Sequence, residues 1–205
     1  MRRAQDILLS SLALVALSPL LLITYAAIWI DSPGASPIFT QQRVGRNGKL
    51  FKMYKFRTMC PDAEQKLKNL MERNEKDGPV FKMKNDPRIT RVGKFLRKTS
   101  IDELPQLFNV LKGEMSIVGP RPERPFFVKQ FIAQKPEYDY RHNVKPGITG
   151  LAQIAGKYNT SAYDKLIYDL LYIQDVSVKT DLMIMLQTFK VLLTKSSTEG
   201  VPVSY

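Results

Sequence analysis

The sequence predicts a mainly α (α+β) monotopic membrane protein, in which an N-terminal re-entrant helix-break-helix precedes a small β-hairpin and several amphipathic interfacial helices. Three observations predict this class. An apolar run near the N-terminus is interrupted by a helix breaker, basic residues lie on both sides of that run, and the later helical segments are too polar to cross a membrane.

The apolar run extends from Ile7 to Ile30 and contains no charged residue. As one helix it would be about 36 Å long, which exceeds a hydrocarbon core of about 30 Å. One interpretation is therefore a spanning helix with a proline kink. The pair Ser18 and Pro19 lies near the centre of the run, where Pro19 removes a backbone donor and clashes with the preceding turn.

The charges that flank the run favour re-entrance over spanning. Arg2 and Arg3 precede it, and the basic residues that follow are Arg43, Arg46, Lys49 and Lys52, with Asp31 opposing them. Because basic flanks stay in the cytoplasm, both ends of the run are expected on one side. A break at Ser18 and Pro19 gives two arms of about 18 Å each. A cleaved signal peptide is disfavoured, since the run is long and no small-residue cleavage site follows.

The composition indicates an anionic partner and limits the kinds of site. The 205 residues include 31 basic and 19 acidic side chains, a net charge of +12. Such an excess suits phosphate-bearing substrates, acidic lipid headgroups or nucleic acid. A single cysteine, Cys60, excludes an internal disulfide, and with one histidine, His142, the usual Cys/His zinc site is excluded too.

A β-hairpin is predicted after the membrane segment. Its strands are Phe39 to Arg43 and Leu50 to Phe56, and Asn47-Gly48 supplies the turn. The basic residues of this region have two interpretations. They form either a charged edge that prevents aggregation or a surface for phosphate and headgroups.

The rest of the chain is predicted to be mainly helical. The capping-box pattern of Ser100 and Glu103 starts one helix, which ends at Lys112-Gly113. A stiff proline loop, Val118 to Pro125, follows it, and Lys145 to Gly150 is a second turn-rich link. The other predicted helices are Asp62 to Asn74, which Asp77-Gly78-Pro79 ends, Phe126 to Ala133, Ser161 to Ile173, and Val178 to Leu193.

The last helix carries an apolar stripe. Its members are Leu182, Met183, Leu186, Phe189 and Leu193. Asp181, Gln187 and Lys190 make the segment too polar to span a bilayer. The default prediction is a core helix, and the alternative is a helix in the membrane interface.

Asp102 and Glu103 are the strongest candidates for chemistry. Adjacent carboxylates repel, and a helix N-terminus would offset that cost by about 0.3–1 kcal/mol per group. An aspartate held ionised there can act as a nucleophile or a metal ligand. The alternative is purely structural: Glu103 caps the helix, and Asp102 interacts favourably with the helix dipole.

Further candidates are basic side chains that can bind phosphate. They are Lys55, Arg57, Arg121 and Arg141. A guanidinium grips phosphate with a planar fork, whereas the ordinary interpretation of each residue is a surface charge. Arg121 is the least ordinary, because prolines on both sides restrict its backbone. His142 is interpreted as structural rather than catalytic.

Taken together, these stretches resemble the monotopic phosphoglycosyl transferases, also called bacterial sugar transferases. The resemblance covers nearly the whole chain, and the long block through "DELPQLFNVLKGEMSIVGPRP" is highly specific. The other matching pieces, in family order, are "LSPLLL", "DSPG", "QQRVGRNGKLFKMYKFRTM", "NDPRITRVGKFLRKTS" and "RHNVKPGITGLAQIAG". "GPRPERPFFVKQF" is more similar to the large members, so the chain is either a natural short form or the catalytic part of a longer protein.

The resemblance implies an activity and a location. It implies transfer of a sugar-1-phosphate from a UDP-sugar to undecaprenyl phosphate, with Mg²⁺, at the cytoplasmic face of the bacterial inner membrane. Residues 1–36 would then be the membrane hairpin and its exit, and residues 37–205 the catalytic domain. UDP-galactose or UDP-glucose is the expected donor, the lipid bilayer is a partner, and a homodimer is an open expectation. This step initiates polysaccharide or glycoconjugate assembly.

The resemblance also implies roles for single residues. Asp102 attacks the β-phosphate of the UDP-sugar and carries the phosphosugar, while Glu103 helps to hold Mg²⁺. Lys55, Arg57, Arg121 and Arg141 follow as phosphate ligands from their positions in the motifs. The alternative function is a non-enzymatic membrane-surface protein that binds anionic lipid or a glycan-assembly partner. Nucleic-acid binding ranks third, since no binding module is recognisable.

Overall fold

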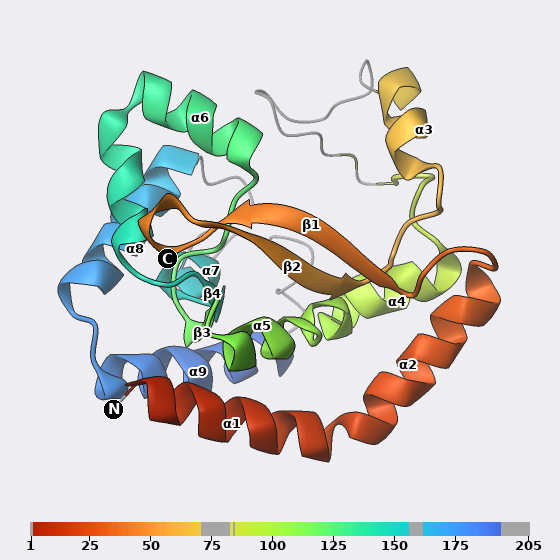
Figure 1. Ribbon diagram of the computed structural model, residues 1–205, viewed down its shortest axis with the longest axis horizontal. Coiled ribbons are helices and arrows are strands. Elements are labelled where there is room, and N and C mark those ends of the chain that lie inside the picture. The colour runs from red at the N-terminus through yellow and green to blue at the C-terminus, as the bar shows by residue number, and fades with distance from the viewer. Residues whose placement is uncertain (1, 71–82, 84, 156–161, 194–205) are drawn as a thin grey trace. The chain divides into compact units, whose positions relative to one another are not determined.

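The computed structural model describes residues 2–70, 83, 85–155 and 162–193, and it is mainly helical (Figure 1). The helices are α1 (Arg2–Ala16), α2 (Ser18–Asp31), α3 (Ala63–Leu70), α4 (Arg91–Thr99), α5 (Gln106–Lys112), α6 (Pro125–Gln134), α7 (Leu151–Ala155), α8 (Ala162–Gln174) and α9 (Val178–Leu193). Short 3₁₀ segments cover Arg46–Gly48, Ile101–Glu103 and Pro136–Asn143. The strands are β1 (Ile38–Val44), β2 (Leu50–Phe56), β3 (Ser116–Val118) and β4 (Gly147–Thr149).

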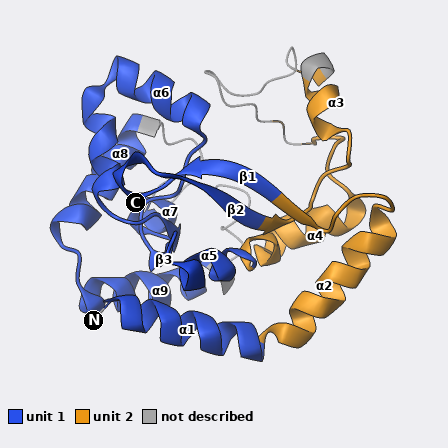
Figure 2. Cartoon of the chain, viewed as in Figure 1, with its two compact units in different colours: residues 1–16, 40–54, 105–205 blue, residues 17–39, 55–104 orange. Residues whose placement is uncertain are grey.

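The chain divides into two compact units, coloured in Figure 2. Unit 1 contains residues 1–16, 40–54 and 105–205, and unit 2 contains residues 17–39 and 55–104. The predicted division at residue 36 concerns a membrane part and a cytoplasmic part, and it stays a prediction.

The apolar N-terminal run breaks next to the predicted position. Leu17, with φ −92° and ψ 2°, separates α1 from α2, and Ser18 and Pro19 open α2. At the start of a helix the missing N–H of proline costs nothing, because no intrahelical acceptor is available there. Among the described residues no single helix is long and apolar enough to cross a bilayer. By length and composition alone, α1 and α2 pass that test only as a bent pair.

The predicted hairpin is confirmed. β1 and β2 form a two-stranded sheet, and Asn47 and Gly48 in their connection both have positive φ, 55° and 73°. Such left-handed pairs match the twist of hairpin strands, which explains the Asn-Gly signal. A second pairing was not predicted. β3 and β4 are parallel, with Ser116 opposite Gly147 and Val118 opposite Thr149.

Most predicted helices are confirmed within the described residues. α9 has the predicted bounds, α6 and α8 agree within a few residues, and α5 ends at Lys112 with Gly113 at φ 82°. α3 covers the first part of the predicted Asp62 to Asn74 helix. The rest of that helix, its Asp77-Gly78-Pro79 end and Ser161 lie outside the described residues.

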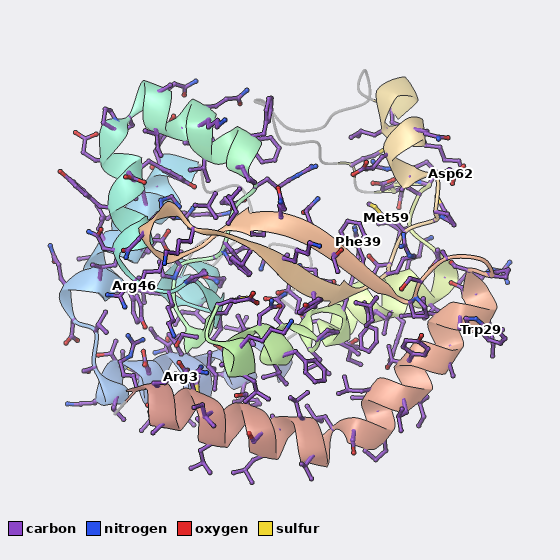
Figure 3. The ribbon with its side chains drawn as sticks, in the orientation of Figure 1. Arg3, Trp29, Phe39, Arg46, Met59 and Asp62 are labelled. Carbon is purple, nitrogen blue, oxygen red and sulfur yellow. The ribbon has the colours of Figure 1, made fainter. Side chains whose placement is uncertain are left out.

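The helix α1 of unit 1 turns its polar residues inward. Asp6 is buried, and its carboxylate accepts hydrogen bonds from Ser116 Oγ (2.9 Å) and from the backbone N–H of Ile117 (3.0 Å). Arg3, labelled in Figure 3, donates to the carbonyl oxygens of Val110 and Leu111, the latter at 2.6 Å. Four large apolar side chains of α1 are exposed, Ile7, Leu8, Leu12 and Val15, while Leu9 and Leu14 are partly buried. This pattern is the reverse of an ordinary soluble helix.

The helix α9, also in unit 1, repeats this reversed pattern. Ile184 and Asp181 are buried, while Leu186 and Phe189 are 71% and 66% exposed. Asp181 pairs with Arg2 of α1 at 2.8 Å and accepts a hydrogen bond from Tyr172 at 2.8 Å. The prediction that the apolar stripe packs in the core is therefore wrong, because Asp181 and Ile184 occupy the inward side of the helix. In unit 2, α2 likewise exposes Leu22, Ile23, Trp29 and Ile30.

A small apolar core organises unit 2. Ile28, Phe56 and Leu96 are buried in it, and partly buried side chains pack around them: Leu21, Ile38, Val92 and Ile101. Ile101 immediately precedes Asp102. The core thus anchors the turn on which the two candidate carboxylates lie.

Candidate functional site

The two candidate carboxylates lie on a short turn in unit 2. Asp102 and Glu103 belong to the 3₁₀ segment Ile101–Glu103, and both are partly buried. Ser100 before them has φ 57° and ψ 15°, the left-handed conformation, and ends α4. Its side chain makes no cap hydrogen bond to the segment that follows.

The predicted capping box is therefore wrong. It assumed that Ser100 starts a helix, whereas Ser100 closes the preceding one, α4, which was not predicted. The two carboxylates thus adjoin the end of α4 and lie in the first turn of a 3₁₀ segment whose N-cap is Ser100. Their charges repel each other and need further stabilisation.

Cations supply that stabilisation. Lys55 at the end of β2 forms an ion pair with Glu103, with 2.9 Å between Nζ and Oε1. Both side chains are about four-fifths buried, at 16% and 20% exposure. The Arg97 guanidinium of α4 attracts Asp102 electrostatically. The structure thus brings Lys55, predicted as a site residue, to the carboxylate pair, and it adds Arg97.

The backbone beside these cations is closely packed. Arg97 Nε donates to Thr58 Oγ1 at 3.0 Å, and the Thr58 carbonyl accepts from the backbone N–H of Thr90 at 3.1 Å. A Cβ added at Gly93 in α4 would lie 2.1 Å from the Thr58 carbonyl oxygen. Only glycine allows α4 to approach this closely, so the position of Arg97 depends on Gly93.

A buried ion pair fixes the neighbouring segment of unit 2. Asp86 accepts hydrogen bonds from the backbone N–H, Nε and Nη2 of Arg88, at 3.0, 2.8 and 2.6 Å. Burial opposes ionisation of Asp86, but the bonds from Arg88 prevail and lower the pKa of this carboxyl. The "NDPRIT" turn is thereby locked, as three charge-assisted bonds to one side chain would predict.

Arg57 also belongs to unit 2 and follows β2. Its Nε donates to the Ser36 carbonyl oxygen at 2.7 Å, and its guanidinium stands over the ring of Phe39, labelled in Figure 3. These contacts hold the residues that follow α2. A phosphate-binding role for Arg57 stays a prediction.

Arg121 and Arg141 meet in unit 1. Arg141 is buried and ion-paired with Asp169 at 2.9 Å, and it also donates to the Tyr138 hydroxyl. Its Nη2 donates to the carbonyl oxygen of Arg121 at 2.8 Å, while the Arg121 side chain itself is exposed. A small pocket is lined by both arginines. Phosphate binding by either residue stays a prediction.

His142 has a partner of its own in unit 1. Nδ1 lies 2.9 Å from Asp139 Oδ1. Burial lowers the pKa of this histidine, and the neighbouring Asp139 only partly opposes the effect. The neutral ring therefore prevails at pH 7, and a structural role for His142 stays a prediction.

The donor set suits a hard cation. Among the described residues no group of three or more His, Cys, Asp or Glu side chains gathers as a protein-only metal cage. Mg²⁺ does not need one, since it is commonly bound through one or two carboxylates together with substrate phosphates and water. The adjacent oxygens of Asp102 and Glu103 fit that pattern.

A model of one protein family, described as bacterial sugar transferase, matches residues 1–195. The chain belongs to the bacterial sugar transferase family. Relatives of this family support the assignment. A UDP-N-acetylgalactosamine-undecaprenyl-phosphate N-acetylgalactosaminephosphotransferase from Aeromonas hydrophila is 44% identical over 196 residues, 94% of this chain and 44% of that protein.

Two further bacterial sugar transferase relatives differ in length. A UDP-glucose:undecaprenyl-phosphate glucose-1-phosphate transferase from Klebsiella pneumoniae is 46% identical over 96% of this chain and 41% of its own. The exopolysaccharide production protein ExoY from Sinorhizobium fredii is 39% identical over 91% of this chain and 83% of its own. The chain thus spans less than half of several relatives and most of ExoY.

Proposed function

We propose that this chain transfers a sugar-1-phosphate from a UDP-sugar to undecaprenyl phosphate and thereby initiates polysaccharide or glycoconjugate assembly. The observation that carries the proposal is the partly buried pair Asp102 and Glu103, with Lys55 held 2.9 Å from Glu103. Relatives named for this reaction on three different sugars support it.

Asp102 acts as the nucleophile. A carboxylate oxygen of Asp102 forms a bond to the β-phosphorus of the UDP-sugar, and the bond from that phosphorus to the bridging oxygen breaks. UMP leaves with the electron pair, and the phosphosugar stays on the aspartate. A phosphate oxygen of undecaprenyl phosphate then attacks the same phosphorus, which frees the Asp102 carboxylate and gives the lipid-linked diphosphosugar.

The cations of unit 2 make this attack feasible. A carboxylate nucleophile is repelled by a diphosphate unless positive charge screens both. Lys55 neutralises Glu103, and Arg97 attracts Asp102 electrostatically. Asp102 and Glu103 would hold Mg²⁺, which when bound neutralises phosphate charge and orients the diphosphate.

The donor sugar is a UDP-hexose. Relatives are named for galactose, glucose and N-acetylgalactosamine, so the family accommodates several sugars. We propose UDP-galactose or UDP-glucose as the donor here. A screen of UMP release over these three UDP-sugars discriminates among them.

The protein acts at the cytoplasmic face of the inner membrane, with residues 1–36 as a re-entrant hairpin. The break at Leu17 and the exposed apolar side chains of α1 and α2 support this topology. α9 lies in the interface, which its exposed Leu186 and Phe189 and its inward Asp181 support. The lipid acceptor and the soluble donor then meet at one surface.

The reaction is tested by UMP release in the presence of UDP-sugar, Mg²⁺ and undecaprenyl phosphate. Asp102→Asn is expected to lower the rate by about 10³-fold or more, as removal of a nucleophile does. Intact-mass measurement of wild type with UDP-sugar alone is expected to show a phosphosugar adduct that Asp102→Asn lacks. Equal rates of UMP release in the two proteins would contradict the mechanism.

The topology is tested by labelling two engineered cysteines in a Cys60→Ser background. Ala4 lies in the first turn of α1 and Pro33 follows α2, and both are exposed, so Ala4→Cys and Pro33→Cys report on each end of the helix pair. An impermeant thiol reagent applied to intact cells is expected to label neither, whereas inverted vesicles expose both. Labelling of one cysteine alone from outside would mean a spanning helix.

A further inference from the structure

The proline loop between β3 and α6 has an unusual backbone. Four successive carbonyl oxygens each accept a hydrogen bond: Pro120 from Gly147 N (2.9 Å), Arg121 from Arg141 Nη2 (2.8 Å), Pro122 from Arg43 Nη1 (3.1 Å) and Glu123 from Val44 N (3.0 Å). Pro120 and Pro122 have no N–H to satisfy. The main chain on both sides of Arg121 is therefore fixed from outside the loop.

Two of the four donors are guanidinium groups that are themselves held in place. Arg141 is buried against Asp169 at 2.9 Å. Arg43 donates to Gln41 Oε1 at 2.7 Å and lies 3.6 Å from Glu123 Oε2. Arginine is suited to this task, because its planar fork can bind a carboxylate and a carbonyl oxygen at the same time.

The Arg121 side chain differs from its backbone in its environment. It is exposed, while Pro120 and Pro122 on either side are buried. A side chain presented from a fixed main chain loses less conformational entropy when it binds a ligand. The geometry thus separates one arginine that faces solvent from two that hold the loop.

We propose that Arg43 and Arg141 are positioning residues, which fix the loop so that Arg121 can grip the phosphates of the substrate. The proposal rests on the proposed function, in which Arg121 is a phosphate ligand. It differs from the expectation that Arg141 itself contacts phosphate. The Arg141 guanidinium instead acts through the Arg121 backbone.

The guanidinium groups of Arg43 and Arg141 together form a brace on the loop. The test measures the coupling between this brace and Arg121. Arg121→Gln and Arg43→Gln are expected each to lower kcat/KM for the UDP-sugar by about 10- to 100-fold, since misplaced binding groups cost that much. If Arg43 acts through Arg121, the double variant is no slower than Arg121→Gln alone. Arg43→Lys keeps one donor to the Pro122 carbonyl and is expected to recover part of the loss.

The Arg141 side of the brace is tested with milder changes, because Arg141 is buried. Asp169→Asn keeps the volume and one acceptor, and Arg141→Lys keeps the charge. Each is combined with Arg121→Gln. Losses that multiply in the Arg141 and Arg121 double variant would show that Arg141 binds phosphate directly, and this would overturn the proposal.

Two controls separate folding from positioning. Lys129→Gln removes an exposed cation from α6 and is expected to leave kcat/KM unchanged. Thermal melting of every variant identifies losses that come from unfolding. If the rates of the variants follow their melting temperatures, and the losses from Arg43→Gln and Arg121→Gln multiply in the double variant, Arg43 has a merely structural role. That result would overturn the proposal.

Binding of UDP by calorimetry keeps the inference apart from the proposed function. If wild type binds UDP but releases no UMP with any UDP-sugar, the proposed function fails, and the same coupling pattern is measured on UDP affinity. If wild type turns over and Arg121→Gln is equally fast, the proposed function stands and this inference fails. If wild type neither binds UDP nor releases UMP, the proposed function and this inference are both wrong.

Discussion

The carboxylate turn and the proline loop hold charged side chains in opposite ways. Asp102 and Glu103 lie on a three-residue 3₁₀ turn, and side-chain cations hold them, with Lys55 2.9 Å from Glu103. Arg121 extends from a loop whose main chain is fixed by four hydrogen bonds to successive carbonyl oxygens. In the carboxylate turn, cationic side chains hold the carboxylates. In the proline loop, the backbone is held and the side chain of Arg121 is exposed.

Under the proposed function, the difference follows from the role proposed for each group. A nucleophile needs its charge stabilised, and an ion pair on its neighbour contributes to this. A phosphate ligand needs a fixed base and a side chain that can reach. The comparison predicts that the turn is sensitive to changes in its packing and charge, whereas the loop is sensitive to changes in its backbone.

The largest effect is expected from Gly93→Ala, which disrupts the packing of α4 beside the carboxylate turn. The added Cβ would lie 2.1 Å from the Thr58 carbonyl oxygen, so α4 must move away from the segment that holds Arg97. We expect a loss of about 3 kcal/mol in the free energy of unfolding, at the upper end for overpacking. Chemical denaturation followed by circular dichroism measures it.

The matched control is Lys94→Ala, an exposed neighbour on the same helix. It is expected to change stability by less than about 0.5 kcal/mol. If Gly93→Ala unfolds at the same denaturant concentration as wild type, the close contact between α4 and Thr58 is not needed.

The next effect concerns charge at the turn. Lys55→Gln leaves Glu103 without the cation 2.9 Å away and is expected to lower kcat for UMP release by about 10²-fold, the cost of one electrostatic donor. Lys55→Arg should recover much of the rate. Lys52→Gln removes an exposed lysine from the same strand, and an equal loss in both variants would mean that only net charge matters.

Much of the local structure was predictable from the sequence, because its signals are local. The Asn-Gly turn, the Gly113 helix end and the bounds of α9 each depend on neighbouring residues. The capping box failed because Ser-x-x-Glu is also compatible with a left-handed residue that ends a helix, as Ser100 does. α4 was not predicted, because its many basic residues obscure the helical spacing of Val92 and Leu96.

The candidate site residues could be named from the sequence, but their contacts could not. Asp102, Glu103 and Lys55 follow from resemblance, yet the Lys55–Glu103 pair joins residues 48 apart, for which no local pattern exists. The parallel pairing of β3 and β4 has the same cause. The brace by Arg43 was missed because a basic residue at a strand end usually indicates a solvated edge.

A smaller effect is expected when the loop backbone is freed. Pro122→Ala retains a Cβ but releases φ and adds an N–H, so the unfolded chain gains entropy and the loop loses rigidity. We expect about 0.4–1 kcal/mol less stability, measured by thermal melting, and a rise in KM for the UDP-sugar larger than any fall in kcat. Pro33→Ala, an exposed proline away from the loop, is the control. Equal KM values in both variants would contradict a role for loop stiffness.

The smallest effect is a pH dependence beside the brace. Burial lowers the pKa of His142, with repulsion from Arg141 adding to it and Asp139 opposing it. The unfolded histidine takes a proton near pH 6.5, while the folded one does so only at lower pH. The unfolded state therefore binds more protons between these two values, so the stabilisation by the neutral ring is complete above about pH 6.5 and is lost as the pH falls.

The difference between wild type and His142→Gln isolates this contribution from other titrating groups. Stability of wild type is expected to fall more steeply than that of His142→Gln from pH 7 to pH 5.5, because the pKa of His142 is lowered in the folded state. Asp139→Asn removes the opposing carboxylate and should steepen the wild-type slope. His142 adjoins Arg141, so UMP release that falls with pH in the same way as stability would connect the brace to the loop. If stability depends on pH equally in wild type and His142→Gln, the ring plays no part.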